Sequence, residues 1–266
     1  MKKINVFLMG GTKESIEVIK HLKKKYNSHI LTTTTTEYGG KLAKEGGSDS
    51  TISKPLPKDD LLEVLNGKTD FDLYIDATHP FASHVTKTAI EVSKICEIPY
   101  IRFERYASNL DNYDKTNIHT VKSFEDAGKL IEKKFNQVNV LHFAGANTMK
   151  DLVKFVSVEK FYPRILEVES SFKKCEKLAI PKENIIPMKG TSTVEENLEL
   201  IDKLNAGLII TKESGEIGGV DAKIKAANIK NIPIILIQRP EIKELDKKTI
   251  VHNLNELDEK IKEYLF

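Results

Sequence analysis

Short apolar segments of strand length alternate with longer segments whose apolar residues recur at helical spacing. This pattern covers almost all of the first hundred residues. Such alternation favours a parallel sheet whose strands are joined by crossover helices. The strands predicted here are Ile4–Met9, His29–Thr33, Leu73–Asp76 and Tyr100–Phe103, and the helices are Lys13–Lys25, Tyr38–Glu45, Asp59–Leu65 and Phe81–Ile95.

The alternation is interrupted once, by the polar and aperiodic residues 107–117. We interpret this segment as a linker between an N-terminal lobe, residues 1–106, and a C-terminal α/β lobe, residues 118–266. The fold predicted is α/β, with two doubly wound, mostly parallel sheets and an interlobe cleft. In the second lobe the expected strands are Val138–Phe143, Ser157–Phe161, Asn184–Met188, Leu208–Thr211 and Pro233–Ile237, and the expected helices are Ser123–Phe135, Thr148–Phe155, Ser170–Leu178, Thr193–Leu204, Asp221–Asn228 and Glu256–Tyr264.

The composition is that of a packed globular protein and excludes several other classes. Of 266 residues, 40% are hydrophobic and 30% charged, and the net charge is +2 with no basic block that would suggest nucleic-acid binding. No apolar run is long enough to cross a membrane, and the first is too short for a signal peptide. Two well-separated cysteines, Cys96 and Cys175, favour a reducing cytoplasm and argue against a structural zinc site. We expect a cytoplasmic enzyme without a metal site, and the oligomeric state stays open.

Arginine is scarce, because only four of the 41 basic residues are arginine. The planar guanidinium binds carboxylates and phosphates through two parallel hydrogen bonds, which lysine cannot do. Arg102, Arg105, Arg164 and Arg239 all follow or end predicted strands. They are therefore candidates for binding an anionic ligand, although an ion pair with Glu104 or a neighbouring helix is the alternative for the first two.

Ligands of open α/β sheets bind beyond the carboxyl ends of the strands. The first strand is followed by a glycine turn that opens a helix, where free backbone amides favour a phosphate. Its candidate cofactor-binding residues are Gly10, Gly11, Thr12, Glu14 and Ser15. The alternative is a capped strand–helix turn, because the third glycine of the full dinucleotide motif is missing. The second strand ends at Thr33 among hydroxyls rather than at an acidic residue, which favours NADP over NAD. The alternative is that these threonines only end a strand and cap the next helix.

The segment from Asp76 to Ala82, Asp-Ala-Thr-His-Pro-Phe-Ala, follows the third of these strands. Its proline can open a helix, and the residue before a proline favours an extended backbone. We therefore expect Thr78, His79, Pro80 and Phe81 to face a ligand, with His79 a candidate proton donor because imidazole titrates near neutral pH. A structural role is the alternative for a single histidine.

A loop rich in glycine and hydroxyl residues follows the strand Leu208–Thr211 in the second half. Its backbone amides, hydroxyls and one ammonium suit an anionic ligand, although the order of a P-loop is absent. The candidate cofactor-binding residues of this loop are Thr211, Lys212, Ser214, Gly215 and Gly219.

These segments together resemble the precorrin-6A reductases of cobalamin biosynthesis, including the cobalt-precorrin-6A reductases. The resemblance runs in family order over nearly the whole chain, and the heptapeptide at residues 76–82 is its most specific part. The chain departs from the family at His142–Asn147, usually a Thr-Thr-Gly-like strand end, and at Gly190–Ser192, usually Gly-Pro-Phe. The matching segments are Gly10-Gly11-Thr12-x-Glu14, Asp76–Ala82, Ile98-Pro99-Tyr100-Ile101-Arg102-x-Glu104-Arg105, Thr211-Lys212-x-Ser214-Gly215 and Ile232-Pro233 through Arg239-Pro240.

The resemblance implies two Rossmann-like lobes with NADPH or NADH between them, and hydride transfer to one double bond of the macrocycle. A tetrapyrrole that carries acetate and propionate groups would need several cationic contacts. The substrate-binding residues we expect are Tyr38, Thr78, His79, Pro80, Phe81, Arg102, Arg105 and Arg239. The state of cobalt insertion and the choice between NADH and NADPH stay open.

Two other functions remain as alternatives. One is a different nucleotide-dependent oxidoreductase or epimerase, for which the usual Tyr-x-x-x-Lys pair is not evident in the sequence. The other is a non-enzymatic nucleotide-binding module, which explains the glycine turns but not the polar clusters at so many strand ends.

Overall fold

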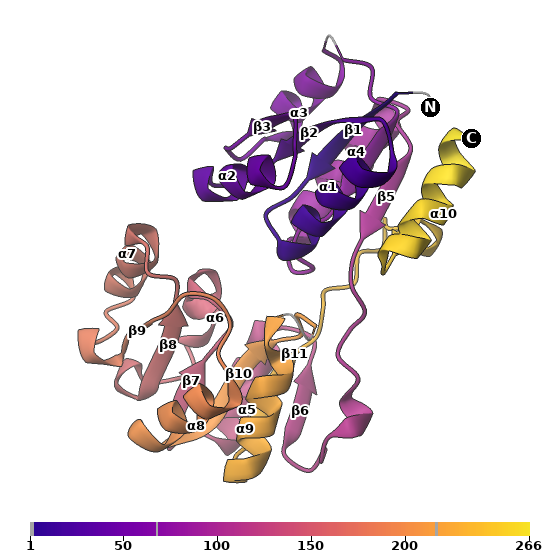
Figure 1. Ribbon diagram of the computed structural model, residues 1–266. Helices are drawn as coiled ribbons and strands as arrows, with labels where there is room; N and C mark the ends of the chain where they lie inside the picture. Colours follow the sequence, from indigo (N-terminus) through magenta and orange to yellow (C-terminus); the bar gives the residue numbers. More distant parts are fainter. Residues whose placement is uncertain (1–2, 68, 216–217) are drawn as a thin grey trace. The chain divides into compact units, whose positions relative to one another are not determined.

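The computed structural model describes residues 3–67, 69–215 and 218–266 (Figure 1). The chain forms two compact units, and one of them is discontinuous in sequence. Residues Met1–Tyr106 and Glu241–Phe266 make up the N-terminal unit, and residues Ala107–Pro240 make up the C-terminal unit.

The N-terminal unit contains a six-stranded parallel sheet in the order β12-β5-β4-β1-β2-β3. This is the 3-2-1-4-5-6 order of doubly wound dinucleotide-binding folds. The strands are β1 (Ile4–Met9), β2 (Ser28–Thr33), β3 (Ser50–Ile52), β4 (Leu73–Asp76), β5 (Tyr100–Phe103) and β12 (Ile250–Val251), and the helices are α1 (Lys13–Lys25), α2 (Glu37–Glu45), α3 (Lys58–Leu65), α4 (Ser83–Ile95) and α10 (Leu254–Leu265).

Helices cover both faces of this sheet, as the nearly continuous burial of β1 requires. Successive side chains of a strand point to opposite faces. Val6 and Leu8 pack in a core with residues of α1, α2 and α10, whereas Phe7 and Met9 pack in a second core with residues of α3 and α4. The unit is therefore a three-layer α/β structure.

The C-terminal unit repeats this arrangement, with strands in the order β6-β11-β10-β7-β8-β9, all parallel. Its strands are β6 (Ile118–Val121), β7 (Asn139–His142), β8 (Phe161–Ile165), β9 (Ile186–Pro187), β10 (Ala206–Lys212) and β11 (Ile234–Ile237), and its helices are α5 (Phe124–Lys134), α6 (Met149–Leu152), α7 (Glu169–Lys177), α8 (Val194–Lys203) and α9 (Val220–Lys230). Both units thus have the doubly wound α/β architecture that was predicted.

The predicted division of the chain is wrong at its C-terminal end. Residues 241–266 belong to the N-terminal unit, because β12 pairs with β5 and α10 buries Leu257 and Ile261 in the core of that unit. Conversely, β6 follows β5 in sequence but pairs with β11 of the C-terminal unit. The sixth strand of the C-terminal unit, β6, and the helix after it, α5, therefore follow β5 of the N-terminal unit in sequence. The sixth strand of the N-terminal unit, β12, and the helix after it, α10, follow β11 of the C-terminal unit.

The predicted linker 107–117 is also part of the C-terminal unit. Within it, residues Leu110–Asn112 form a 3-10 turn, and Leu110 and Tyr113 pack against the core that β10 and α9 build. The segment is polar because most of its other residues are exposed. Polarity alone could not reveal that two of its apolar residues attach it to the sheet.

Several predicted elements are shifted or shorter in the structure. The strand expected at Ser157–Phe161 is a 3-10 turn followed by β8, and the one at Asn184–Met188 is reduced to the two residues of β9. The helix expected at Thr148–Phe155 is the four-residue α6 after a 3-10 turn. The strands β3, β6 and β12 were not predicted, because they are two to four residues long and only partly buried, so they lack a periodic apolar signal.

A buried aspartate attaches α10 to α1. Asp258 is 4% exposed, and its carboxylate accepts hydrogen bonds from His21 Nε2 at 2.8 Å, Lys25 Nζ at 2.5 Å and the Tyr26 hydroxyl at 2.8 Å. Burial raises the pKa of Asp258, but these three donors outweigh it and leave the pKa below its usual range. A carboxyl whose folded pKa is lowered stabilises the fold above the unfolded pKa and loses this effect as pH falls.

Replacing Asp258 with asparagine is expected to lower the free energy of unfolding by about 1–3 kcal/mol at pH 7, because buried donors lose a charged acceptor. The difference from the parent should shrink as pH falls below about 4, the ordinary pKa of an aspartate. Urea unfolding at pH 7 and pH 3.5 measures both effects. The exposed neighbour Glu259 provides the control E259Q, and equal stability of D258N and E259Q at pH 7 would contradict the assignment.

Candidate active site

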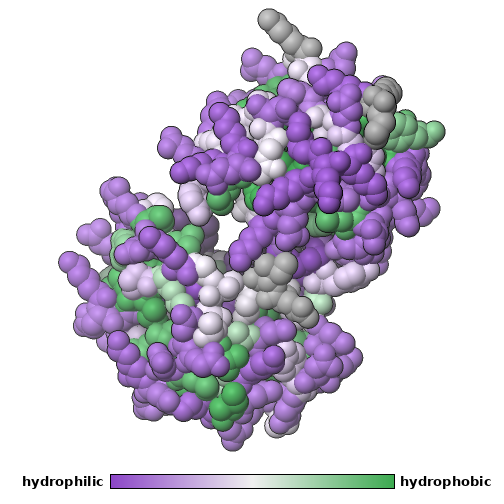
Figure 2. Space-filling view, in the orientation of Figure 1, coloured by the Kyte–Doolittle hydropathy of each residue, from purple (hydrophilic) through white to green (hydrophobic). Residues whose placement is uncertain are grey.

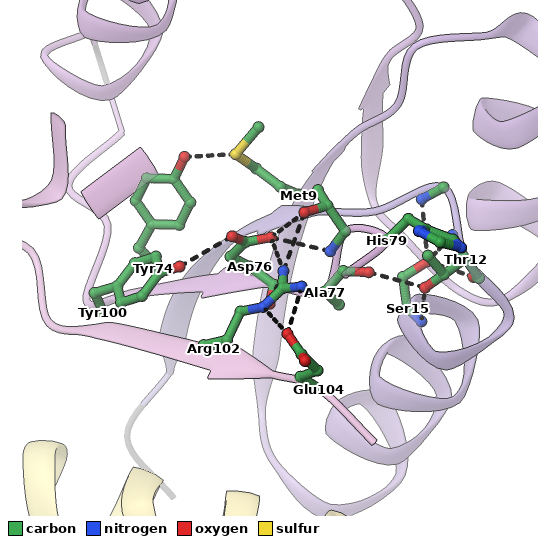
Figure 3. Close-up of polar contacts among 12 residues, drawn as sticks. Met9, Thr12, Ser15, Tyr74, Asp76, Ala77, His79, Tyr100, Arg102 and Glu104 are labelled. Atoms are coloured by element: carbon green, nitrogen blue, oxygen red, sulfur yellow. Dashed lines mark hydrogen bonds and ion pairs between the residues drawn. The ribbon is translucent and has the colours of Figure 1, made fainter. Parts of the chain in front are cut away.

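The predicted segments of the N-terminal unit meet at the switch point of its sheet, between β1 and β4. After β1, the next two strands, β2 and β3, are added on one side of β1 in the sheet. The chain then returns to form β4 on the opposite side of β1. Thr12, which caps α1, donates from Oγ1 to the carbonyl oxygen of Ala77 at 2.8 Å, and the Ala77 amide donates to Met9 at 2.9 Å (Figure 3). The glycine turn and the Asp76–Ala82 segment are therefore adjacent, at the position where doubly wound folds bind ligands.

The glycine turn after β1 leaves room for a ligand at Gly11. This residue has φ = +104°, and a side chain there would be strained although the space beside it is open. Gly10 donates its amide to the carbonyl oxygen of Thr33 at 2.8 Å, and Ser15 completes a capping box with Thr12. Thr33 thus supports the glycine turn through its backbone carbonyl oxygen, because its side chain is buried.

Two of the candidate ligand contacts are paired with each other in the structure. Glu14, in the first turn of α1, is buried and forms an ion pair with Arg105. Glu14 was expected to bind the cofactor, and Arg105 was expected to bind the substrate. In the structure their charges compensate each other beside the glycine turn.

Arg102 is fully buried, with 0% of its side chain exposed, so its predicted role as a substrate contact is wrong. Its Nη1 lies 2.8 Å from Asp76 Oδ1, and its Nη2 lies 2.9 Å from Glu104 Oε2 (Figure 3). Burial lowers the pKa of Arg102, but the two carboxylates outweigh burial and raise it. The alternative interpretation, an internal ion pair, is what the structure shows.

Asp76 is the centre of this buried network. Its carboxylate accepts hydrogen bonds from the Tyr100 hydroxyl at 2.9 Å, from Thr78 Oγ1 at 2.6 Å and from the Thr78 amide at 3.0 Å. Burial raises the pKa of Asp76, but Arg102 and the Thr78 donors outweigh burial and lower it. Asp76 therefore stays ionised near neutral pH, and its hydrogen bonds with Thr78 orient the turn that carries the next residues of the motif.

His79 is the exposed member of the motif. Its Nδ1 accepts a hydrogen bond from the Phe81 amide at 3.2 Å, and its ring centre lies 5.9 Å from that of Phe81. An Nδ1 that accepts leaves the proton of the neutral ring on Nε2. Tyr38, the predicted substrate contact at the start of α2, is 71% exposed. Both side chains are accessible to a ligand.

The C-terminal unit has an equivalent switch point, between β7 and β10. The Phe143 amide, just after β7, donates to the Ile210 carbonyl oxygen in β10 at 2.7 Å. The loop after β10 contains the predicted Ser214 and Gly215, while residues 216 and 217 lie outside the described ranges. Gly219 has φ = +72° and precedes α9, and a side chain there would meet Thr191 at 3.2 Å.

Glu213 contacts both the segment with which the chain enters the C-terminal unit, at Ser108, and the segment with which it leaves, at Arg239. Its carboxylate accepts a hydrogen bond from the Ser108 amide at 3.0 Å and forms an ion pair with Arg239. It also accepts from the Gly215 amide at 2.9 Å. Arg239, predicted to bind substrate, is therefore engaged with an internal carboxylate.

Sequence reasoning missed Lys223, which is buried in the first turn of α9. Its Nζ donates to Thr211 Oγ1 at 3.2 Å. Burial, with repulsion from Arg164 and Lys212, lowers its pKa to about 7. The available signal was a lysine placed among buried helix positions such as Val220.

His142, at the end of β7, was noticed in the sequence only as a departure from the family pattern. It is fully buried, and its Nε2 lies 3.0 Å from Thr148 Oγ1. Burial, with repulsion from Lys212, lowers its pKa to about 3. It is therefore neutral near pH 7 and unsuited to donate a proton there.

The described ranges contain no group of three or more histidine, cysteine, aspartate or glutamate side chains arranged to hold a metal ion. In the same ranges, no helix combines the length and apolarity that a membrane span requires.

Comparisons with known proteins agree over nearly the whole chain. The chain is 42% identical over 240 residues to a cobalt-precorrin-6A reductase of Methanocaldococcus jannaschii, covering 90% of this chain and 92% of that protein. It is 35% identical over 257 residues to the Methanothermobacter thermautotrophicus cobalt-precorrin-6A reductase, covering 96% and 83%. Among solved structures, the precorrin-6A reductase CobK has the same fold, with a TM-score of 0.74 at 19% identity over 98% of this chain and 97% of CobK.

Residues 5–262 match the family described as "Precorrin-6x reductase CbiJ/CobK". This match includes both switch points and the crossing segments that lead from one unit to the other. The chain belongs to the precorrin-6x reductase family.

Proposed function

We propose that this protein reduces one double bond of precorrin-6A or cobalt-precorrin-6A with NADPH or NADH, giving the corresponding precorrin-6B. The observation that carries the proposal is the position of the Asp76–Ala82 segment. This most specific segment of the family resemblance lies beside a glycine turn at the switch point of a 3-2-1-4-5-6 sheet, the usual ligand position of such folds.

Several features of the chain fit a nicotinamide dinucleotide. Gly11 offers a close approach to backbone with open space beside it, and helices start directly after both switch-point loops. Residues 10–15 and 211–219 are the segments we propose to hold the cofactor. Hydroxyls rather than a carboxylate at the end of β2 favour NADPH over NADH. The bound cofactor would supply the hydride.

The surface also offers contacts for a large, partly apolar macrocycle. On the face seen in Figure 2, hydrophilic residues cover most of both units, and hydrophobic residues reach the surface at several places. Tyr38 follows β2, and Leu166 and Val168 follow β8, so all three exposed side chains lie near carboxyl ends of strands. We propose that such residues contact the macrocycle.

His79 is the proton donor that we propose for the carbon next to the hydride acceptor. Its ring is exposed, and the Phe81 amide fixes its orientation so that Nε2 carries the proton. Replacing His79 with alanine is expected to lower kcat about 100- to 10,000-fold, the usual effect of losing a general acid. NADPH affinity should stay unchanged. His84, an exposed histidine on α4, provides the control H84A, and near-normal turnover of H79A with saturating cofactor would exclude the role.

The overall function is tested by anaerobic incubation of the purified protein with cobalt-precorrin-6A and each cofactor in turn. We expect oxidation of NADPH together with a spectral change of the macrocycle. Binding of NADPH without reduction of either precorrin-6A form would contradict the proposal and favour a nucleotide-binding module. Reduction of a different carbonyl or alkene substrate would favour another oxidoreductase.

A further inference from the structure

His252, which sequence reasoning did not single out, lies at the same edge of its sheet as the candidate active site. It follows β12, which pairs with β5, and β5 pairs with β4. All strands of this sheet are parallel, so their carboxyl ends meet at one edge, together with the Asp76–Ala82 segment and the glycine turn. Neighbouring strands are about 4.8 Å apart, so about 10 Å separates the ends of β12 and β4.

The imidazole ring of His252 is held in one orientation. Its Nδ1 lies 2.6 Å from the carbonyl oxygen of Glu104, and the ring stacks on Tyr106, with 4.2 Å between ring centres and 23° between ring planes. Because a carbonyl oxygen can only accept, Nδ1 carries a proton. The Tyr106 hydroxyl donates to Glu256 at 3.0 Å, and Glu256 also accepts the His252 amide at 2.7 Å. The ring is therefore positioned before any ligand binds.

The second ring nitrogen of His252, Nε2, forms no hydrogen bond within residues 3–67, 69–215 and 218–266. The residue is partly exposed. Since Nδ1 already donates, Nε2 is the nitrogen that can contact a ligand, and it becomes a second donor when the ring gains a proton. A side chain whose orientation is already fixed loses less conformational entropy when a ligand binds. His252 is therefore preorganised for a contact through Nε2.

A carboxylate suits this nitrogen better than a neutral group. When the ring carries a second proton, it keeps its bond to the Glu104 carbonyl oxygen and gains a donor at Nε2. A carboxylate at Nε2 would hold that proton through a charge-assisted hydrogen bond. The arginines of this unit, Arg102 and Arg105, form ion pairs with carboxylates of the unit itself. A ligand that carries several carboxylates therefore needs donors other than the arginines that the sequence suggested.

We propose that Nε2 of His252 donates a hydrogen bond to a carboxylate of the bound macrocycle. The proposal rests on the proposed function, because it takes a tetrapyrrole with acetate and propionate groups as the ligand. A phosphate of the cofactor fits less well. The glycine turn follows β1, and β1 lies three strands from β12 in the sheet, about 14 Å away. A tetrapyrrole beside the Asp76–Ala82 segment is broad enough to reach the end of β12, two strands away.

The variant His252→Asn separates this contact from a structural role. The asparagine amide can replace Nδ1 as the donor to Glu104, but it offers no atom at the position of Nε2. H252N should therefore melt within about 3 °C of the parent. Its Kd for cobalt-precorrin-6A, measured anaerobically by absorption without nicotinamide cofactor, should be about tenfold higher. His29, at the amino end of β2 on the opposite edge of the sheet, provides the control H29N, which should bind like the parent.

Two further measurements identify the ligand group. The protein has no tryptophan, so NADPH fluorescence reports cofactor binding without that background, and the Kd for NADPH should be the same in H252N and the parent. With the carboxylates of the macrocycle converted to methyl esters, the difference between H252N and the parent should disappear.

Three results would overturn the proposal but leave the reductase function standing. They are an equal Kd of H252N and the parent for cobalt-precorrin-6A, a loss of affinity confined to NADPH, and a loss that persists with the methyl ester. A parent protein that neither binds nor reduces cobalt-precorrin-6A would overturn both the contact and the proposed function.

Discussion

Removing residues 241–266 is expected to unfold the N-terminal unit and to leave the C-terminal unit folded. The removed segment contributes Val251, Leu257 and Ile261, each at most 2% exposed in the core of the N-terminal unit. At about 1.5–3 kcal/mol for each buried side chain, the loss is roughly 5–9 kcal/mol. A whole domain is stable by only about 5–15 kcal/mol, so the truncated unit should not remain folded.

Circular dichroism and thermal melting of three fragments measure this effect. Residues 107–240 should melt cooperatively, because every strand of that sheet lies inside the fragment. Residues 1–106 alone should show no cooperative transition. Joining residues 241–266 to residue 106 through a flexible linker should restore one. A cooperative transition in fragment 1–106 would show that the returning segment is not needed for folding.

Replacing Arg102 with methionine is expected to lower the free energy of unfolding by about 3–5 kcal/mol. The change leaves the Asp76 carboxylate buried without its cation, which is the costly way to break a buried ion pair. Arg102→Met combined with Asp76→Asn removes both charges and should recover part of the loss. Urea unfolding of the parent, both single variants and the double variant gives the coupling between the two residues, and purely additive effects would contradict a direct pair.

The contribution of Asp76 to the free energy of unfolding should change with pH in opposite directions in the Arg102→Met variant and in the parent protein. In the parent, the pKa of Asp76 is lowered, so its contribution is present above the unfolded pKa and lost as pH falls. Without Arg102, burial raises the pKa of Asp76, and stability is lost as pH rises through that value. The stability difference between variant and parent should therefore be larger at pH 8 than at pH 4.

The helices and strands with strong local signals could be predicted from the sequence. The helix Lys13–Lys25 was predicted with its observed bounds, because its apolar spacing and the capping threonine before it are local features. The strands Leu73–Asp76 and Tyr100–Phe103 were also predicted as observed, since all four residues of each are buried. Strand β12, which has two residues, has no comparable pattern.

The sequence predicted which segments follow the strands of the two switch points, and the roles of their residues in ligand binding stay a prediction. Ligands of open α/β sheets bind beyond the carboxyl ends of strands, and this principle singled out the Asp76–Ala82 segment and the loop after Thr211. The structure places each segment at a switch point. Arg102 was misjudged because its role depends on register. Asp76 and Arg102 are direct partners on neighbouring strands, so the scarce guanidinium binds an internal carboxylate. Lys223 was missed because its burial depends on how α9 packs.

The sequence by itself determined the α/β class, the alternation of strands and helices, and the family resemblance. These follow from local periodicity, capping and short motifs, which need no knowledge of distant contacts. Only the tertiary structure decided that the last 26 residues complete the N-terminal sheet, that the Asp76–Arg102 pair is buried, and that His252 stacks on Tyr106. Each of these depends on strand pairing or packing between residues far apart in the chain, and local sequence patterns carry no record of such partners.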